Sequence, residues 1–301
     1  MSKEVIEIAS KHLGQTVSEY SDLYDTSLLV KVPRNLNREA YGIDENNLPF
    51  VGFDVWNAYE VSAITQKGRP VSGLLKIVYP SNSKYHVESK SIKLYLNSFN
   101  MTPLGKNKQE CINMIQAFVA NDLSKLLECQ VECKLHTEGQ LDDYGNDMWL
   151  GFNEFTNIEN LVDLDKIKFT AYKSDETQLK VDRNENEIFF HSDMLRSNCR
   201  VTNQPDWGDI YVYMKGDKTI TPTSFAKYIV SHRKVSHFHE EICEMVFKHL
   251  YDKCKPEELM VACLYTRRGG LDINPVRTTH DWNIPDGFAD VEYINEKTLR
   301  Q

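Results

Sequence analysis

The chain has 301 residues, 41% of them hydrophobic, which is enough for the core of one large domain or two ordinary ones. Its 44 acidic and 35 basic residues give a formal net charge of −9, which argues against a broad nucleic-acid-binding face. No apolar run approaches the roughly eighteen residues of a membrane span, and the amino terminus lacks the features of a signal peptide. The seven cysteines are scattered, and none forms a CxxC pair, which favours reduced thiols in a cytoplasmic protein.

The first 50 residues are polar and rich in asparagine and proline, and we expect them to wrap the surface of a larger unit. The next segments, within 51–137, show the hydrophobic periods of strands and of an amphipathic helix. In chain order we predict a strand over 53–65, a turn at Gly68 and Pro70, a hairpin partner over 74–79, a helix over 111–127 and a strand over 130–135. The acidic, glycine- and asparagine-rich region 138–164 is expected to be a linker.

The second half, 165–301, repeats this order of elements without an obvious repeat of sequence. We predict a strand opening at 188–190, a strand over 210–214, a helix starting at Thr221-Pro222, a helix over 238–250 that ends before Pro256, and a strand over 259–265. Because the helices follow hairpins instead of alternating with strands, an α+β fold with antiparallel sheets is favoured over a doubly wound sheet.

The stretch from Ser197 to Trp207 places Cys199 seven positions before Asp206 in a polar turn that contains proline. A thiolate can attack an electrophilic carbon, and a nearby acid can protonate the atom that gathers negative charge. The alternative is that Cys199 is an inert, small hydrophobic residue and that Asp206 only forms a turn.

A second candidate lies at the start of the helix over 238–250. On a helical projection His239 falls at the edge of the apolar stripe, while Glu240 lies off it. Glu240 could accept two hydrogen bonds from the N–H and amino edge of a guanine-like ring, with His239 bonding a neighbouring ring atom. It could equally be a first-turn acid favoured by the helix dipole, with His239 a core histidine.

Two further stretches carry charge beside small residues. Arg267-Arg268-Gly269-Gly270 could bring side chains and backbone N–H groups to an anion, although an exposed basic turn is the alternative. Glu88-Ser89-Lys90-Ser91 could offer a carboxylate to a polar ring edge and a cation to a phosphate, or it could be a solvated loop. No GxGxxG follows a strand, so a Rossmann site is not supported.

Taken together, these motifs resemble the NADPH-dependent 7-cyano-7-deazaguanine reductases, the nitrile reductases of queuosine biosynthesis, in their long, two-module form. The resemblance covers most of the chain and is weakest over about 135–185. The stretches that carry it are Pro33–Arg38, Asn47–Phe50, Glu88–Phe99, Ser197–Cys199, Gln204–Gly208, Phe238–Glu240 and Tyr265–Pro275.

The resemblance implies tandem tunnelling-fold (T-fold) modules, with helices packed on one face of antiparallel sheets, in a cytoplasmic homodimer. It implies reduction of a 7-deazapurine nitrile to a primary amine with two NADPH, through a covalent thioimide, without a metal ion and without direct contact to nucleic acid. The family's nucleophile falls on Cys199 and its proton donor on Asp206. Its substrate contacts fall on Val87, Glu88, Ser89, His239 and Glu240, and its cofactor contacts on Ser89, Lys90, Arg268 and Gly269.

Two other functions remain open at this point. A zinc-dependent cyclohydrolase of the same fold could use His237, His239 and Cys199 as ligands, but Asp206 and the arginine-glycine turn would then lack a role. A non-catalytic purine-binding or RNA-binding protein is disfavoured by the net charge and by the pairing of Cys199 with Asp206.

Overall fold

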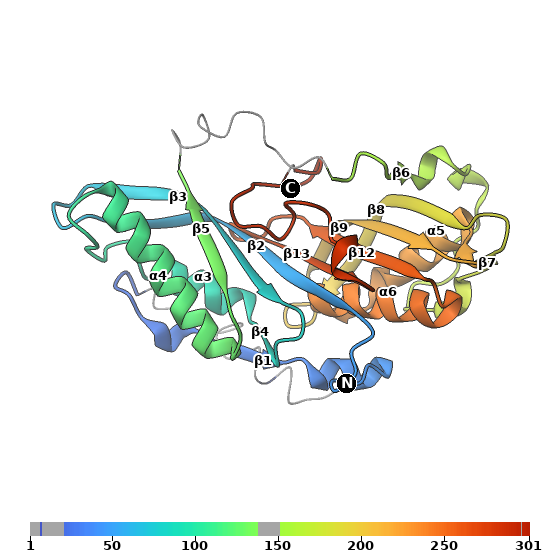
Figure 1. Cartoon of the computed structure of the whole chain (residues 1–301), viewed down its shortest axis with the longest axis horizontal. Coiled ribbons are helices and arrows are strands. Elements are labelled where there is room, and N and C mark those ends of the chain that lie inside the picture. Colours follow the sequence, from blue (N-terminus) through green and yellow to red (C-terminus); the bar gives the residue numbers. More distant parts are fainter. Residues whose placement is uncertain (1–6, 8–20, 138–150, 296) are drawn as a thin grey trace.

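The computed structural model describes residues 7, 21–137, 151–295 and 297–301 (Figure 1). The larger strands are β2 (Val51–Ile64), β3 (Pro70–Pro80), β5 (Glu132–His136), β8 (Glu187–Cys199), β9 (Pro205–Lys215), β12 (Glu258–Tyr265) and β13 (Leu271–Thr278). The short strands are β1 (Lys31–Pro33), β4 (Tyr85–Val87), β6 (Thr156–Asn157), β7 (Val181–Asp182), β10 (Thr219–Ile220) and β11 (Ser236–His237). The helices are α2 (Asn35–Arg38), α3 (Ser89–Asn97), α4 (Lys108–Leu127), α5 (Pro222–Ser231) and α6 (His239–Cys254).

One nine-stranded sheet runs through the molecule in the order β11-β8-β9-β12-β13-β2-β3-β5, with β6 also paired to β8 (Figure 1). All pairings are antiparallel except those of the short β6 and β11, which are parallel to β8. The predicted α+β class with a large antiparallel sheet is therefore confirmed.

The four longer helices cover one face of this sheet, because alternate strand residues point to opposite sides. On β12, Val261 packs into the core beneath α5 and α6, while its neighbour Ala262 packs into a different cluster on the other face. That second cluster includes Phe288 from the C-terminal segment. The sheet is thus a middle layer, with helices on one side and the C-terminal segment on the other.

The hairpins and the helices near 111–127, 221–230 and 238–250 agree with the sequence predictions, but other elements were not predicted, of which α3 and β13 are the longest. Residues 89–97 form α3, whose polar first residues hide the helical period, and 271–278 form β13, which directly follows the arginine-glycine turn. Thr156–Asn157, inside the expected linker, joins the sheet through β8, while 138–150 lie outside the described residues.

The two halves share an internal repeat, whose contacts go beyond the repeated order of elements expected from the sequence. Asp25 and Asp175 each cap a short 3₁₀ helix, and each donates a backbone N–H to a serine hydroxyl. The serines are Ser98, the C-cap of α3, and Ser231, the last residue of α5. A short strand pair follows in each half, β1 with β4 and β7 with β10. The hairpins β2–β3 and β8–β9 both contain a register shift. The polar contacts of the repeat are preserved although most residues differ.

The halves join along a seam between β13 and β2, which pair over eight residues from Leu271↔Ala58 to Thr278↔Val51. Gly52 permits the close approach, since a Cβ there would lie 2.1 Å from the carbonyl oxygen of Val276.

Buried charges reinforce this junction. Arg277 of β13 bonds Asp54 of β2 at 2.8 Å and Glu244 of α6 at 2.9 Å. Arg38 of α2 also binds Glu244, at 2.7 Å, and Arg34 binds Asp54. Removing one member of such a group leaves a buried charge uncompensated, so these ion pairs fix how the elements fit together. They hold the N-terminal segment and α6 against the seam.

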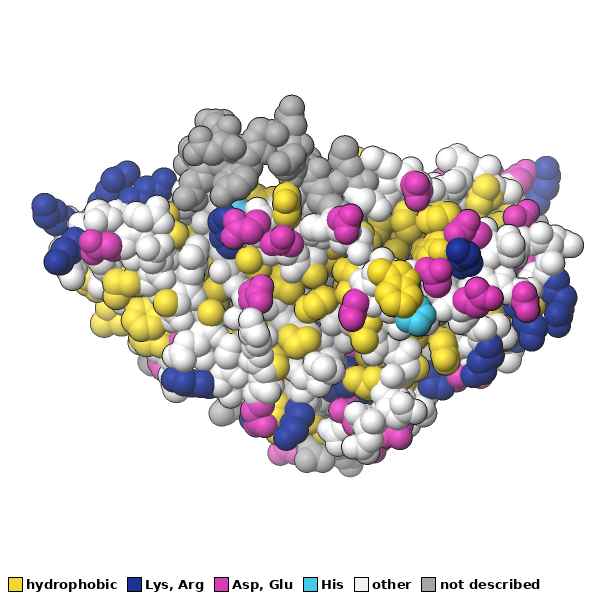
Figure 2. All heavy atoms as spheres, viewed as in Figure 1, with side chains coloured by type: hydrophobic (Ala, Val, Ile, Leu, Met, Phe, Trp, Pro, Cys, Tyr) yellow, Lys and Arg dark blue, Asp and Glu magenta, His cyan; other side chains and the backbone are white. Residues whose placement is uncertain are grey.

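The face of the molecule in Figure 2 mixes acidic, basic and apolar side chains, with no continuous patch of Lys and Arg. No helix among the described residues is long and apolar enough to cross a membrane.

Candidate active site

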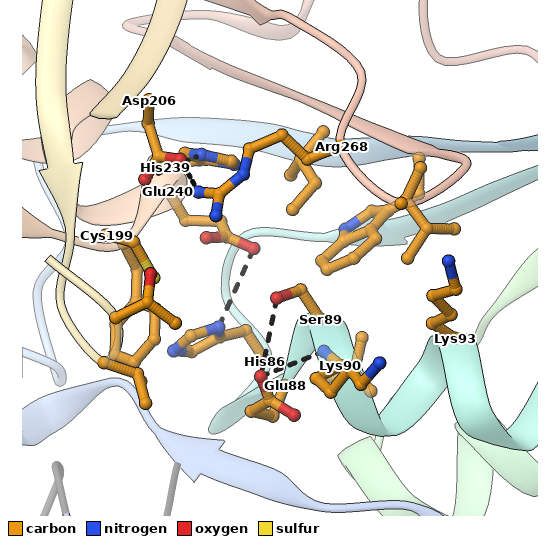
Figure 3. Close-up of a pocket in the computed structure, with 18 of the residues that line it drawn as sticks. His86, Glu88, Ser89, Lys90, Lys93, Cys199, Asp206, His239, Glu240 and Arg268 are labelled. Carbon is orange, nitrogen blue, oxygen red and sulfur yellow. Dashed lines mark hydrogen bonds and ion pairs between the residues drawn. The ribbon is translucent and has the colours of Figure 1, made fainter. Parts of the chain in front are cut away.

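A cavity of about 380 Å³ opens where the tip of the β8–β9 hairpin meets the N-terminal ends of α3 and α6 (Figure 3). All of the predicted site residues line it: Val87, Glu88, Ser89, Lys90, Cys199, Asp206, His239, Glu240, Arg268 and Gly269. The first half supplies four of these and the second half six, so one pocket is assembled across the seam.

Cys199 and Asp206 lie on neighbouring strands instead of in one long loop. Cys199 ends β8, and its backbone N–H donates to the Gln204 carbonyl at 2.7 Å. Asn203, with φ of 56°, donates to the Cys199 carbonyl at 2.9 Å and closes the turn. Asp206 pairs with Ser197 near the start of β9. The hairpin thus gives the partly buried thiol and the buried carboxyl group fixed positions on the cavity wall.

The carboxylate of Asp206 lies between two basic groups. Arg268 donates to its Oδ1, and Nε2 of His239 lies 3.4 Å from its Oδ2. Burial on its own would raise the pKa of Asp206, but the interactions with His239 and Arg268 outweigh burial and hold that pKa below its usual range. Asp206 is therefore ionised at neutral pH.

The first residues of α6, His239 and Glu240, form one wall of the cavity. His239 stacks on Tyr265, with ring centroids 3.8 Å apart and an interplanar angle of 17°. Glu240 is buried, with 4% of its surface exposed, although the helical projection placed it off the apolar stripe. Its Oε1 has no hydrogen-bond partner among the described residues. A buried carboxylate oxygen without a donor costs free energy, and a ligand with N–H groups would remove that cost.

Glu88 has a structural role that sequence reasoning did not identify. It is the N-cap of α3, and its carboxylate accepts the backbone N–H groups of Lys90 at 2.9 Å and Ser91 at 2.7 Å. Burial is the largest influence and raises the pKa of Glu88, against the opposing effect of these hydrogen bonds. Val87, at the end of β4, is also buried.

Cationic groups gather at the mouth of the cavity. Lys93, which was not predicted, lies one turn after Lys90 on α3, and both line the cavity. Gly269 has φ of 59°, and a Cβ there would lie 3.1 Å from Nζ of Lys93. Arg268 also donates to Oε1 of Gln204 at 2.8 Å. The mouth of the cavity thus combines positively charged side chains with a glycine, Gly269, whose backbone a ligand can approach closely.

His86 and Trp56 also line the cavity and were missed. His86 belongs to β4, two positions before Glu88, and Figure 3 shows it between Glu88 and Glu240. The alternation of an extended segment could have indicated it, because positions two apart face the same side. Trp56 lies on β2, whose residues looked like ordinary core in the sequence.

The two histidines weighed above as zinc ligands each have another partner. Nδ1 of His237 lies 2.8 Å from Oε1 of Glu241, and His239 faces Asp206. Within the described ranges no group of three or more His, Cys, Asp or Glu side chains is arranged to hold a metal ion.

Comparisons with known proteins place these features in a family context. The family described as "Nitrile reductase, 7-cyano-7-deazaguanine-reductase N-term" matches residues 20–135, and "QueF-like protein" matches 205–283. A Rickettsia akari protein named NADPH-dependent 7-cyano-7-deazaguanine reductase is 38% identical over 272 residues, 90% of this chain and 94% of that protein. A protein of the same name from Colwellia psychrerythraea is 36% identical over 302 residues, 98% of this chain and 97% of its own. Another from Rickettsia canadensis is 36% identical over 98% of this chain and 99% of its own. The apo structure of an archaeosine synthase QueF-Like matches 31% of this chain and 93% of its own with 16% identity and a TM-score of 0.29, too low for any argument from it.

Proposed function

We propose that this chain, which belongs to the family of NADPH-dependent 7-cyano-7-deazaguanine reductases, reduces the nitrile of 7-cyano-7-deazaguanine to the aminomethyl group in queuosine biosynthesis. The observation that carries the site assignment is the single pocket that contains Cys199, Asp206, Glu240 and Glu88. A reactive thiol, an ionised acid and a carboxylate with an unpartnered oxygen are the groups that this reaction needs.

The first step makes the nitrile carbon more reactive. The Asp206 carboxylate accepts the proton of the Cys199 thiol, and the thiolate adds to the nitrile carbon. Asp206 then returns that proton to the nitrile nitrogen, which gives a thioimide bonded to Cys199. One C–S bond forms, one π bond of the nitrile is lost, and no atom leaves. The lowered pKa of Asp206 supports this order, because a carboxylate must be present to take the proton first.

Bound NADPH would supply the hydride for each of the two reductions of the former nitrile carbon. After the first reduction the C–S bond breaks, Cys199 leaves as a thiolate and takes up a proton from solvent, and an imine remains in the pocket. After the second reduction the amine nitrogen takes up the other proton. Because free imines hydrolyse, the walls around Glu240 and Asp206, which are 4% and 3% exposed, protect it from water. Nitrile to amine is a four-electron change, which two NADPH account for.

The residues at the mouth fit such a co-substrate. Lys90, Lys93 and Arg268 offer positive charge to its phosphates, and Gly269 allows its backbone to approach closely. Ser89 lies between this region and the base-binding acids, so it belongs to both.

Glu240 and Glu88 hold the base. Oε1 of Glu240 is buried without a donor, which supports its pairing with the N–H and amino edge of the deazaguanine ring. His239, stacked on Tyr265, contacts the ring beside the reacting group, and Val87 contributes apolar wall. Holding the nitrile over the sulfur is catalysis by positioning.

The chain's architecture is that of two tandem T-fold modules, 51–137 and 165–301, with 138–164 as a linker and 1–50 as an amino-terminal wrapping segment. The bulged hairpins, one in each module, support this division. The 3₁₀ helix capped by Asp25 belongs to the first repeat as well, although it lies within 1–50. As in the resemblance above, the protein is a cytoplasmic homodimer, which sedimentation equilibrium and localisation of the native protein test.

The covalent step gives a direct test. Incubated with the nitrile and no NADPH, the protein should gain the mass of one intact substrate, and Cys199→Ala should gain nothing. Cys129→Ala is the matched control, because Cys129 is also partly buried but lies outside the pocket. Full adduct on Cys199→Ala, or none on the unchanged protein, would contradict the proposal.

A further inference from the structure

We propose that His86 is a positioning residue that orients Glu240 for the base, an inference that rests on the proposed role of Glu240. His86 lies on β4 in the first half, and Glu240 begins α6 in the second. Its Nδ1 is 3.7 Å from Oε1 of Glu240 (Figure 3). This is beyond hydrogen-bond length but within ion-pair range, so a small approach on ligand binding completes the contact.

The surroundings hold His86 at this place. Only 3% of the residue is exposed. Its ring meets the edge of Phe238, the N-cap of α6, with centroids 4.9 Å apart and an interplanar angle of 68°. β4 is in turn paired with β1, where His86 lies opposite Val32. The imidazole therefore has few alternative orientations.

The carboxylate of Glu240 needs such a partner. It is buried, its Oε1 receives no hydrogen bond within the described ranges, and an unsupported carboxylate can rotate. Each carboxylate oxygen can accept two hydrogen bonds, so a His86 contact at Oε1 leaves the other acceptor site of Oε1, and Oε2, for the N–H groups of the ring. A carboxylate held from one side presents its remaining acceptor sites in a fixed direction, as supporting groups do for other ligating side chains.

His86 also lies close to the second acid of the pocket, because it stands two positions before Glu88 at the end of β4 (Figure 3). Burial raises the pKa of Glu88, and a positive charge on the imidazole would oppose this rise. The imidazole thus lies between the two carboxylates that are proposed to read the base, one from each half of the chain.

Two substitutions separate positioning from packing. His86→Phe keeps the bulk and the edge contact with Phe238 but removes the donor. His86→Asn loses bulk but keeps a donor near the place of Nδ1. If His86 positions Glu240, His86→Phe should weaken ligand binding roughly tenfold and His86→Asn much less. The opposite ranking would show a packing role and overturn the inference.

The ligand for this test is 7-aminomethyl-7-deazaguanine, the product, which has the same ring edge but cannot form a thioimide. Its dissociation constant is measured by calorimetry on the full chain, with His136→Phe as control, since His136 is another buried histidine that bonds the Val291 carbonyl away from the pocket.

A double-mutant cycle separates the role of His86 from the role of Glu240. In a Glu240→Ala background, His86→Phe should have no further effect, because there is no carboxylate left to orient. Full additivity would overturn the role of His86 alone. Unchanged affinity in the Glu240→Ala single variant would instead contradict the proposed role of Glu240 in base binding.

Discussion

The protonation state of Asp206 during the reaction depends on Arg268. Arg268 was predicted to bind the cofactor, and it also donates to Asp206 and Gln204. Both roles are compatible if the guanidinium stays with Asp206 during thiol attack and turns to a phosphate afterwards. On leaving, it would let the pKa of Asp206 rise and favour the protonated form.

This arrangement predicts the pH dependence of adduct formation. Because His239 and Arg268 hold the pKa of Asp206 below its usual range despite burial, Asp206 stays ionised at mildly acidic pH. The rate should fall only as the pH drops through that lowered pKa. Arg268→Gln should raise the pKa and move the acid limb to higher pH.

The profile is measured as the rate of mass gain with the nitrile and no NADPH. Arg267→Gln is the control, because Arg267 lies over the ring of Tyr59 instead of facing Asp206. An acid limb unchanged in Arg268→Gln would show that the guanidinium does not set the protonation of Asp206.

At the scale of elements, α3 shows how a helix cap became part of a binding site. Glu88 caps α3 through Ser91 N–H at 2.7 Å, and Thr221 caps α5 through Ser224 N–H at 3.3 Å, at the equivalent position of the repeat. The Thr221 hydroxyl caps α5 through one N–H group, whereas the Glu88 carboxylate caps α3 through two, those of Lys90 and Ser91. Only the carboxylate carries a negative charge, which strengthens the hydrogen bonds that it accepts from the N–H groups of a guanine-like ring.

The repeat therefore supplies its own test substitution. Glu88→Thr should keep the cap and leave the free energy of unfolding within about 0.5 kcal/mol, whereas Glu88→Ala should cost about 1 kcal/mol. Both should weaken binding of the aminomethyl product. Denaturant unfolding and calorimetry on the same samples separate the two effects. Equal stability of the Thr and Ala variants would argue against capping by Glu88.

The two longest elements that the sequence did not predict, α3 and β13, show what a local sequence pattern leaves out. Amphipathic α4 and α6 were found because their apolar residues recur at helical steps, whereas α3 opens with Ser89-Lys90-Ser91, which reads as a loop. β13 alternates apolar Leu271 and Ile273 with polar Asp272 and Asn274, as a strand does, but Pro275 interrupts the run and argues against a central strand. Both elements depend on partners far away in the chain, which local pattern does not contain.

The predicted site residues differ from these elements, because short motifs pointed to all ten of them and all ten line the pocket. The motifs could not reveal which groups these residues face. The place of His86 beside Glu240 depends on the seam, because the seam joins the two halves of the chain. The pairing of Arg268 with Asp206, 62 positions apart, forms within the second half.

For the whole molecule, the seam makes one site from two unequal halves. In the first half, the tip of the β2–β3 hairpin, equivalent to that of β8–β9, carries no cysteine between Thr65 and Arg69. Titration with the nitrile should therefore end at one covalent adduct per chain. Two adducts per chain would show a second reactive site.

A protein of residues 165–301 alone should be inactive, because it lacks Glu88 and Lys90 and leaves β13 without β2. NADPH oxidation by that piece, compared with the full chain at equal concentration, checks this. Activity close to that of the full chain would show that the first half is dispensable.

The pocket draws Glu88 and Cys199 from the same polypeptide, and this has a genetic consequence. Where each protomer contributes both parts of its own site, two defective alleles cannot repair each other, even when their products meet in one oligomer. A cell with one allele damaged at Glu88 and another at Cys199 would remain without the enzyme, and the locus would behave as a single complementation group.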